Sequence, residues 1–322
     1  RAERAKAGLK RYYDDPLAFA EECIIWRPGE ALTPYQRDIL ADFVPQRRVS
    51  IRGPHSLGKT CIAAILVLWF SLTREDAGED WKVPTTASSW RQLKEYLWPE
   101  VHKWSRRLRW GTLNLEGFNE RTQLHKLSLT LDYGQAFALA SDQPALLEGA
   151  HAGQILYIFD EAKLIGGDTF DAAEGALSSG SAYALMLSTP GEPSGRFYEV
   201  QSRKPGYEDW HVRYVTREEV VAAGRMTPEW AEQRARQWGV GSAVYQNRVE
   251  GEFASSAEDG VIPLSWVEKA VERWYAWMEA EKERPEDERT PFVGVGVDVG
   301  RGEDQTVLAL RYGDCVTELR RY

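Results

Sequence analysis

Eight consecutive residues have the types and spacing of a loop that binds phosphate groups. The run Gly53-Pro54-His55-Ser56-Leu57-Gly58-Lys59-Thr60 fits the pattern G-x-x-x-x-G-K-[ST]. In such a loop, backbone N–H groups close around phosphate oxygens at the positive end of a helix. Lys59 would reach the β- and γ-phosphates of a nucleotide, and Thr60 would bind Mg²⁺. The pattern predicts nucleotide binding, and a glycine-rich turn before a core helix is the alternative.

Two adjacent carboxylates are the next candidates for chemistry. Asp160 and Glu161 directly follow the apolar run Ile155 to Phe159, which is typical of a central parallel strand buried on both faces. An open α/β sheet binds its ligands at the carboxyl ends of such strands. We expect Asp160 to bind Mg²⁺, largely through water, and Glu161 to polarise an attacking water molecule. Alone, the pair would also fit the acidic first turn of a helix.

Three polar side chains complete the expected nucleotide site. Gln36 lies on the first turn of a helix that Thr33 caps and Pro34 begins, and its amide can pair with both edges of adenine. Ser188 and Thr189 end the apolar run 182–187, where hydroxyl groups can sense the γ-phosphate. An exposed helix glutamine and an ordinary strand-ending turn are the alternatives.

Several arginines are candidates for stabilising negative charge. Arg196 opens a short helix. A helix expected over about 88–108 has one apolar face, and its other positions are strongly basic, with Arg106 and Arg107 near its end. This basic face would contact a phosphate backbone, or it is simply a solvated face.

The elements that must position these residues alternate in type along the chain. Strands are expected at 48–51, 81–86, 112–115, 127–131, 136–139, 155–159, 182–187 and 210–215, and helices at 61–70, 227–238 and 242–250. This order predicts an α/β core over 1–207 with a central, mainly parallel sheet, followed by a small lid over 208–258. Residues 259–322 then read as a linker helix and a β-meander with strands at 292–298, 306–312 and 315–320.

Composition narrows the class of protein. The 322 residues carry a formal net charge of −9, so any contact with nucleic acid must come from local patches. The longest largely apolar run, Cys61 to Leu72, is shorter than the roughly 20 residues that span a bilayer. The three cysteines lie far apart, which argues against a zinc site or a disulfide framework. We see no signal peptide and expect a cytoplasmic protein with no membrane partner.

The order of motifs resembles the large terminase subunit of tailed bacteriophages. The resemblance rests on Tyr35-Gln36, Arg52 to Thr60, Thr85 to Gln92, Asp160-Glu161, Ser188-Thr189-Pro190 and Gly296 to Gly300. It implies a DNA-packaging motor with an N-terminal P-loop ATPase of the RecA-like, additional-strand (ASCE) type, a lid, and an RNase H-like nuclease domain. ATP and Mg²⁺ are then the expected cofactors.

The resemblance also implies roles for single residues. Glu161 becomes the catalytic carboxylate, and Ser188-Thr189-Pro190 couples hydrolysis to movement. Many relatives have an arginine at the position of His55, so Arg52 is the expected substitute. The arginine that a neighbouring subunit supplies is assigned to Arg196 or to Arg106 and Arg107.

The nuclease part is expected to be incomplete. Asp298 matches the first-strand ligand for Mg²⁺ or Mn²⁺, and the family needs further carboxylates on later strands. A chain that ends at Tyr322 is therefore expected to be part of a longer protein and unable to cut DNA.

The implied partners are double-stranded DNA, a portal protein, a small terminase subunit and further copies in a ring on the procapsid, within an infected bacterial host cell. A helicase-like, DNA-dependent ATPase is one alternative, which needs a second RecA-like domain of about 150 residues. A nucleotide-gated binding module without catalysis is the other, and Glu161 argues against it.

Overall fold

The computed structural model describes residues 8–140, 151–177, 181–254, 264–300 and 305–322. The chain divides into two compact units, Arg1–Ala254 and Ser255–Tyr322. The division at 254/255 lies close to the expected boundary at 258/259, and the finer boundary at 207/208 remains a prediction. No helix in the described ranges is long and apolar enough to cross a membrane.

The first unit is built on an eight-stranded sheet with the order β3-β4-β5-β2-β6-β7-β1-β8. The strands from β5 to β8 in that order pair in parallel, and β3 and β4 form an antiparallel edge. The strands are β1 Arg48–Arg52, β2 Trp81–Ala87, β3 Leu124–His125, β4 Ser128–Thr130, β5 Gly134–Ala140, β6 Gln154–Asp160, β7 Ala182–Ser188 and β8 His211–Tyr214. This sheet confirms the predicted α/β class.

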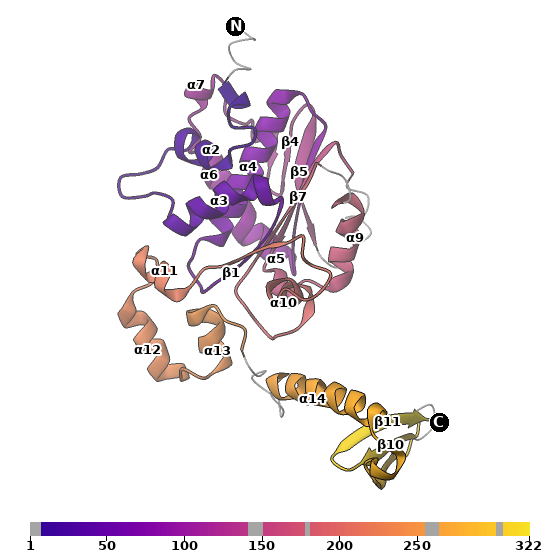
Figure 1. Ribbon diagram of the computed structural model, residues 1–322. Coiled ribbons are helices and arrows are strands. Elements are labelled where there is room, and N and C mark those ends of the chain that lie inside the picture. The colour runs from indigo at the N-terminus through magenta and orange to yellow at the C-terminus, as the bar shows by residue number, and fades with distance from the viewer. Residues whose placement is uncertain (1–7, 141–150, 178–180, 255–263, 301–304) are drawn as a thin grey trace. The chain divides into compact units, whose positions relative to one another are not determined.

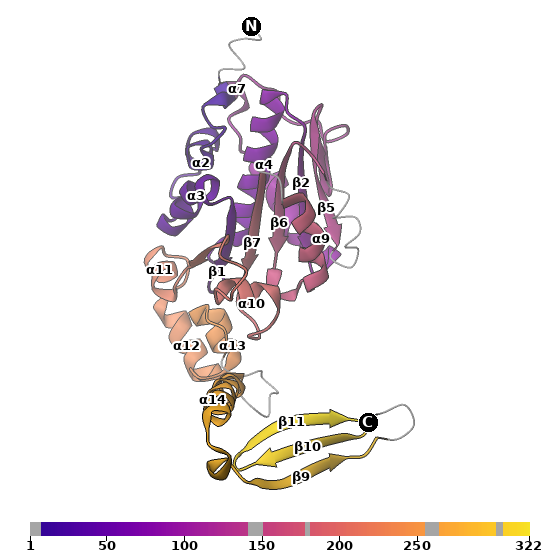
Figure 2. The ribbon, with the colours of Figure 1, turned by 45° about the vertical axis from the view of Figure 1, so that its right-hand side comes forward.

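Helices cover both faces of the sheet (Figures 1 and 2). On one face lie α2 (Pro16–Cys23), α3 (Pro34–Gln46), α4 (Lys59–Ala77) and α6 (Trp98–Ser105); on the other lie α9 (Gly167–Leu177) and α10 (Gly195–Gln201). Alternate residues of β6 enter two separate cores: Leu156 and Ile158 pack with α4, whereas Tyr157 and Phe159 pack with α9 and α10. A strand buried on both faces must be apolar throughout, which is why β6 reads as a continuous run.

The helix before α6 contains a π-turn. Trp90–Gln92 forms α5, Leu93–Leu97 forms the π-turn η1, and Trp98 N–H donates to Leu93 O. Pro99 follows at the start of α6 and has no N–H to donate, so the wider turn replaces a regular one. The apolar face expected for residues 88–108 is buried and consists of Leu93, Leu97, Val101, Trp104 and Leu108.

Two local predictions differ from the structure. Residues 110–113 form the short helix α7 (Trp110–Leu113), so a strand at 112–115 was wrong. The ring of Trp110 packs on Phe118 and its Nε1 donates to Ser105 O, which holds this segment against α6. The helix α11 (Arg217–Ala222) was not predicted, although Thr216 and Glu219 form a capping box at its start.

The end of the first unit consists of the lid helices, which we define as α11, α12 (Pro228–Trp238), α13 (Ala243–Tyr245) and the π-turn η3 (Gln246–Glu250). They follow β8, which pairs with β1. The strand directly before the phosphate loop and the strand leading into the lid helices are therefore neighbours.

The second unit contains one long helix and a β-meander. Its elements are α14 (Leu264–Glu283), the short 3₁₀ helix η4 (Glu286–Glu288), β9 (Phe292–Asp298), β10 (Val307–Tyr312) and β11 (Cys315–Arg321). The strands pair antiparallel in the order β11-β10-β9, as predicted. An RNase H-like nuclease start remains a prediction.

Candidate active site

The loop between β1 and α4 has the backbone of a phosphate cradle. Its first glycine, Gly53, has no room for a side chain, because a Cβ atom there would lie 2.7 Å from Val215 O. Gly58 has φ +87°, and a Cβ atom would lie 2.4 Å from Gln36 Nε2. Both glycines of the motif are therefore required by the local geometry.

The helix α3 holds the loop from one side. Tyr35 Oη donates to Leu57 O at 3.0 Å, and Gln36 Nε2 donates to Leu57 O at 3.3 Å and to Gly58 O at 3.5 Å. Gln36 Oε1 accepts from Thr33 N–H at 3.0 Å. The Gln36 amide thus positions the loop and caps its own helix, and recognition of adenine by Gln36 remains a prediction.

Lys59 lies buried at the start of α4. Its Nζ is 3.5 Å from Pro54 O, so it bends back over the loop. Desolvation lowers the pKa of Lys59, while the carboxylates Glu161 and Asp160 act in the opposite direction. A buried ammonium beside a phosphate loop is suited to binding an anion.

Asp160 is the last residue of β6 and is 3% exposed. Burial and the neighbouring Glu161 raise the pKa of Asp160 to about 7, and Lys59 lowers it. No group of three or more His, Cys, Asp or Glu side chains in the described ranges is arranged for a metal ion. Mg²⁺ at Asp160 and Thr60 would therefore take its other oxygen ligands from phosphate and water, as is usual for this ion.

Glu161 contacts the tip of the neighbouring strand β7. Ser188 Oγ donates to Glu161 Oε2 at 3.1 Å. Lys163, two residues further on, donates from Nζ to Thr189 Oγ1 at 2.9 Å and to Pro190 O at 3.2 Å. The structure thus joins Glu161 to the hydroxyl group of Ser188, whereas the hydroxyl group of Thr189 is bound by Lys163. Lys163 was missed because a lysine after an acidic pair carries no spacing signal.

Two adjoining cavities open at the phosphate loop. The first, of about 490 Å³, is lined by His55, Ser56, Gly58, Lys59, Thr60, Glu161, Gly224 and Arg225. The second, of about 580 Å³, shares Gly58, Thr60, Gly224 and Arg225 and extends past Gln36 to Trp26 and Trp104. Volumes of this size fit a small-molecule ligand.

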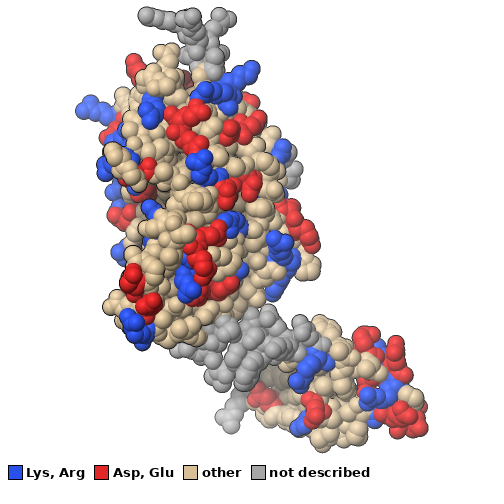
Figure 3. Space-filling model, turned by 60° about the vertical axis from the view of Figure 1, so that its left-hand side comes forward, with Lys and Arg blue, Asp and Glu red and all other residues tan. Residues whose placement is uncertain are grey.

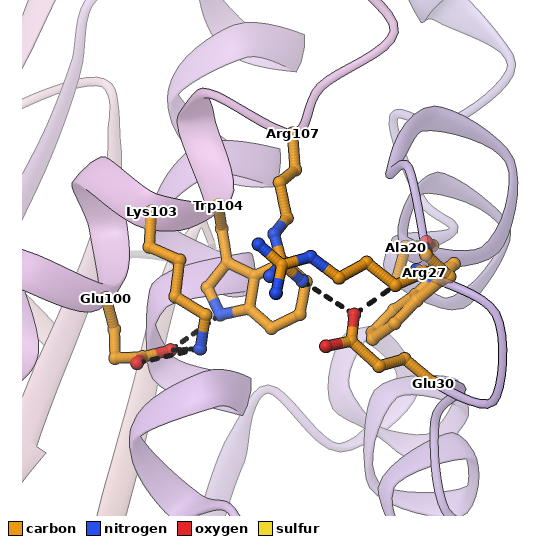
Figure 4. A network of polar contacts seen from close by, with 8 residues as sticks. Ala20, Arg27, Glu30, Glu100, Lys103, Trp104 and Arg107 are labelled. Atoms are coloured by element: carbon orange, nitrogen blue, oxygen red, sulfur yellow. Dashed lines mark hydrogen bonds and ion pairs between the residues drawn. The ribbon is translucent and has the colours of Figure 1, made fainter.

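Part of the predicted basic helix lines the second cavity. Figure 4 shows the polar contacts of its side chains with neighbouring residues. Arg107 Nη1 donates to Glu30 Oε2 at 2.7 Å, and Lys103 Nζ donates to Glu100 at 3.0 Å. Arg106 lies 3.6 Å from Glu120. These cations are paired with carboxylates of the same chain, which leaves less positive charge on this helix than its sequence suggests.

The structure does not bring Arg52 or Arg196 to the two cavities. Arg52 Nη1 pairs with Glu252 Oε2 at 2.8 Å. Arg196 Nη2 pairs with Asp171 at 2.6 Å. Asp298 ends β9 in the second unit, whereas the residues that line the two cavities belong to the first. The roles assigned to these three residues remain predictions.

The phosphate loop is approached by η3 of the lid helices, by the turn between α11 and α12, and by the glycine that follows η3. His55 N–H donates to Arg248 O at 3.0 Å, and Arg225 Nε donates to Ser56 O at 3.4 Å. Gly251 has φ +72°, and a Cβ atom there would lie 2.6 Å from Pro54 N. Desolvation and the charges of Lys59 and Arg248 lower the pKa of His55 to about 4.

Part of the sequence is similar to a named phage protein. A segment of 134 residues is 33% identical to the probable terminase large subunit of Enterobacteria phage P7 and covers 39% of this chain and 26% of that protein. Over this segment the chain is similar to a phage large terminase subunit. The matched segment spans about a quarter of that relative, and no family model matches the sequence.

Solved phage large terminases share the fold of this chain. The HK97 bacteriophage large terminase covers 100% of this chain and 67% of its own, with a TM-score of 0.58 and 17% identity. The large terminase of a thermophilic bacteriophage covers 91% and 69%, with a TM-score of 0.54 and 13% identity. The ATPase domain of the Thermus phage P74-26 large terminase covers 71% and 94%, with a TM-score of 0.53 and 18% identity. The first unit therefore has the P-loop ATPase fold, and the second of these three proteins has been solved with ADP and with ATP-γ-S.

Proposed function

We propose that this chain contains the ATP-hydrolysing motor of a packaging terminase, which translocates double-stranded viral DNA into a procapsid. The observation that supports hydrolysis best is Glu161, which lines the same cavity as Lys59 and is held by Ser188. A binding loop alone would need no such carboxylate.

The phosphate groups are bound by the loop and by α4. Backbone N–H groups of residues 53–60 and the Lys59 ammonium compensate the charge of the β- and γ-phosphates. Mg²⁺ held by Thr60 and Asp160 would neutralise charge that develops on the phosphate oxygens. Since Asp160 is deeply buried with a pKa of about 7, a cation bound there would also favour the ionised form of its carboxyl group.

Glu161 then orients and deprotonates the attacking water. The hydrogen bond from Ser188 fixes one carboxylate oxygen, which leaves Glu161 Oε1 to accept from water. General base catalysis of this kind contributes roughly 10² to 10⁴ in rate. When the γ-phosphate leaves, a shift of Glu161 would move Ser188, and a shift of Lys163 would move Thr189. The tip of β7 would then relay the change in nucleotide state.

The proposed partners are double-stranded DNA, a portal protein, a small terminase subunit and further copies of the chain in a ring. Acidic and basic side chains are interspersed on the face shown in Figure 3, so the DNA contact must be local. In the longer protein, Asp298 would contribute to a nuclease site for Mg²⁺ or Mn²⁺.

Steady-state ATP hydrolysis with and without duplex DNA tests this function. The wild-type chain should hydrolyse ATP faster when DNA is present, and Lys59→Ala should lose both turnover and tight ATP binding. Lys282→Ala, an exposed lysine on α14, is the matched control and should behave as wild type. Equal turnover by wild type and Lys59→Ala would contradict the proposed ATPase activity. A rate of hydrolysis that does not change when duplex DNA is added would contradict the proposed motor function.

A further inference from the structure

Arg225, in the turn that connects α11 and α12, extends its side chain over the phosphate loop. Arg225 lies between α11 and α12, and its Nε donates to Ser56 O at 3.4 Å. Its Nη2 lies 3.4 Å from the position that a Cβ atom would take on Gly58. Arg225 lines both cavities, so its guanidinium stands where they join.

The guanidinium of Arg225 has no carboxylate partner among the described residues. Other arginines near the lid helices are paired: Arg217 Nη1 lies 2.7 Å from Glu250 Oε1, and Arg213 pairs with Glu219. The side chain of Arg225 is exposed, and its one hydrogen bond to Ser56 is long. An unpaired guanidinium beside an anion-binding loop is suited to phosphate, because its fork of donors matches phosphate oxygens.

The backbone on both sides of Arg225 is fixed to α11 and α12. A shift of the Arg225 side chain is therefore coupled to a shift of these helices. Arg225 N–H donates to Val220 O at 3.0 Å, closing the end of α11. Met226 is 7% exposed, and Thr227 caps α12 by accepting from Trp230 N–H at 3.2 Å. A force on the guanidinium is therefore transmitted to both helices.

We propose that Arg225 binds the phosphate groups of ATP held by its own chain and thereby couples nucleotide occupancy to the position of the lid helices. This inference rests on the proposed function. Replacing one long bond to Ser56 O by charge-assisted bonds to phosphate favours the bound state. The arginine acts in cis, in addition to any arginine that a neighbouring subunit supplies.

Calorimetric titration with a non-hydrolysable ATP analogue tests the contact. Loss of a hydrogen bond between charged groups predicts that Arg225→Ala binds the analogue roughly 10- to 100-fold more weakly. Arg225→Lys should fall between the two, because lysine keeps the charge without the fork. Arg236→Ala, on exposed α12 next to Glu232, is the matched control and should bind as wild type.

Hydrogen exchange tests the coupling. In the wild-type chain, saturating analogue should slow exchange in α11 and α12, and Arg225→Ala should lose this protection even at saturation. Retained protection would overturn the coupling, and unchanged affinity would overturn the contact. An affinity loss seen only at concentrations where the chain oligomerises would assign the arginine to the neighbouring subunit instead. If Arg225→Ala has a lowered Tm, the better-tolerated Arg225→Lys decides both points.

Binding of the ATP analogue by the wild-type chain separates failure of the proposed function from failure of the role proposed for Arg225. A wild-type chain that binds no ATP analogue contradicts the proposed function itself. A wild-type chain that binds it as tightly as Arg225→Ala contradicts only the role of Arg225.

Discussion

Several residues at the nucleotide site hold more than one partner. Lys163 is an example: its backbone N–H lies 3.5 Å from Ser188 Oγ, while its ammonium binds Thr189 and Pro190. Burial lowers the pKa of Lys163, and Glu161 raises it. Lys163 therefore links the loop that carries Glu161, the proposed catalytic carboxylate, to the tip of β7 through contacts that substitutions can remove one at a time.

A double-mutant cycle tests the contact between Lys163 and Thr189. Lys163→Met and Thr189→Val should each lower ATP turnover by about tenfold, and the double variant should lose little more, since residues in contact couple by about 0.5–3 kcal/mol. ATP affinity should change by less than about threefold, because neither side chain lines the cavities. Additive losses in turnover would show that the two side chains act independently.

The His55 side chain should make the stability of the folded chain depend on pH. Its pKa is about 4 in the folded chain and about 6.5 when unfolded. As pH falls below about 6.5 the unfolded state binds the proton first, so stability is lost between about pH 6.5 and 4. Urea unfolding at pH 7.5 and pH 5 should show a smaller loss for His55→Asn than for wild type. Equal losses would exclude His55 as a cause.

At the scale of elements, the phosphate loop is held between α3 and the end of η3. Gly251 closes η3 with its backbone against Pro54, and Gln36 of α3 approaches Gly58 from the other side. The loop can therefore be displaced by changing a residue that never touches nucleotide.

Two glycines with nearly the same backbone angles test this packing. Gly251 has φ 72° and ψ 26°, and Gly78, after α4, has φ 71° and ψ 28° with only Tyr133 nearby at 3.9 Å. Alanine at either position should cost roughly 1–2 kcal/mol from the left-handed backbone. Gly251→Ala should lower the free energy of unfolding by about 1–3 kcal/mol more, because its Cβ atom would clash with the backbone of Pro54. The same clash should also weaken ATP binding. Equal losses in both variants would mean that the loop moves freely.

The elements also show what the sequence can predict. Strands β1, β6 and β7 and helix α4 were predicted because buried parallel strands and a core helix produce continuous apolar runs. The strand expected at 112–115 is α7 instead, since tertiary contacts of Trp110 override a short β-like pattern. The π-turn η1 could not be predicted from periodicity, which assumes a constant helical repeat.

At the scale of the whole molecule, every residue lining the two cavities belongs to the unit Arg1–Ala254. The candidate site was predictable where motif spacing marks it, as at Lys59, Thr60 and Asp160-Glu161. Lys163 and Arg225 were not predictable, because single cations in turns acquire their partners only when distant segments fold together.

A chain of residues 1–254 should therefore bind ATP within about threefold of the 322-residue chain, because the described residues that line the two cavities belong to the unit Arg1–Ala254. Titration of both chains with the same ATP analogue measures this, and Lys59→Ala in the shorter chain provides the negative control. A large loss of affinity in the shorter chain would show that the second unit completes the site.

The most direct test of the central claim is single-turnover ATP hydrolysis by wild type and Glu161→Gln. Glutamine keeps the size of Glu161 and a partner for Ser188 but cannot accept a proton. We predict that Glu161→Gln binds ATP as tightly as wild type and hydrolyses it at least about 100-fold more slowly. Hydrolysis at the wild-type rate would contradict it.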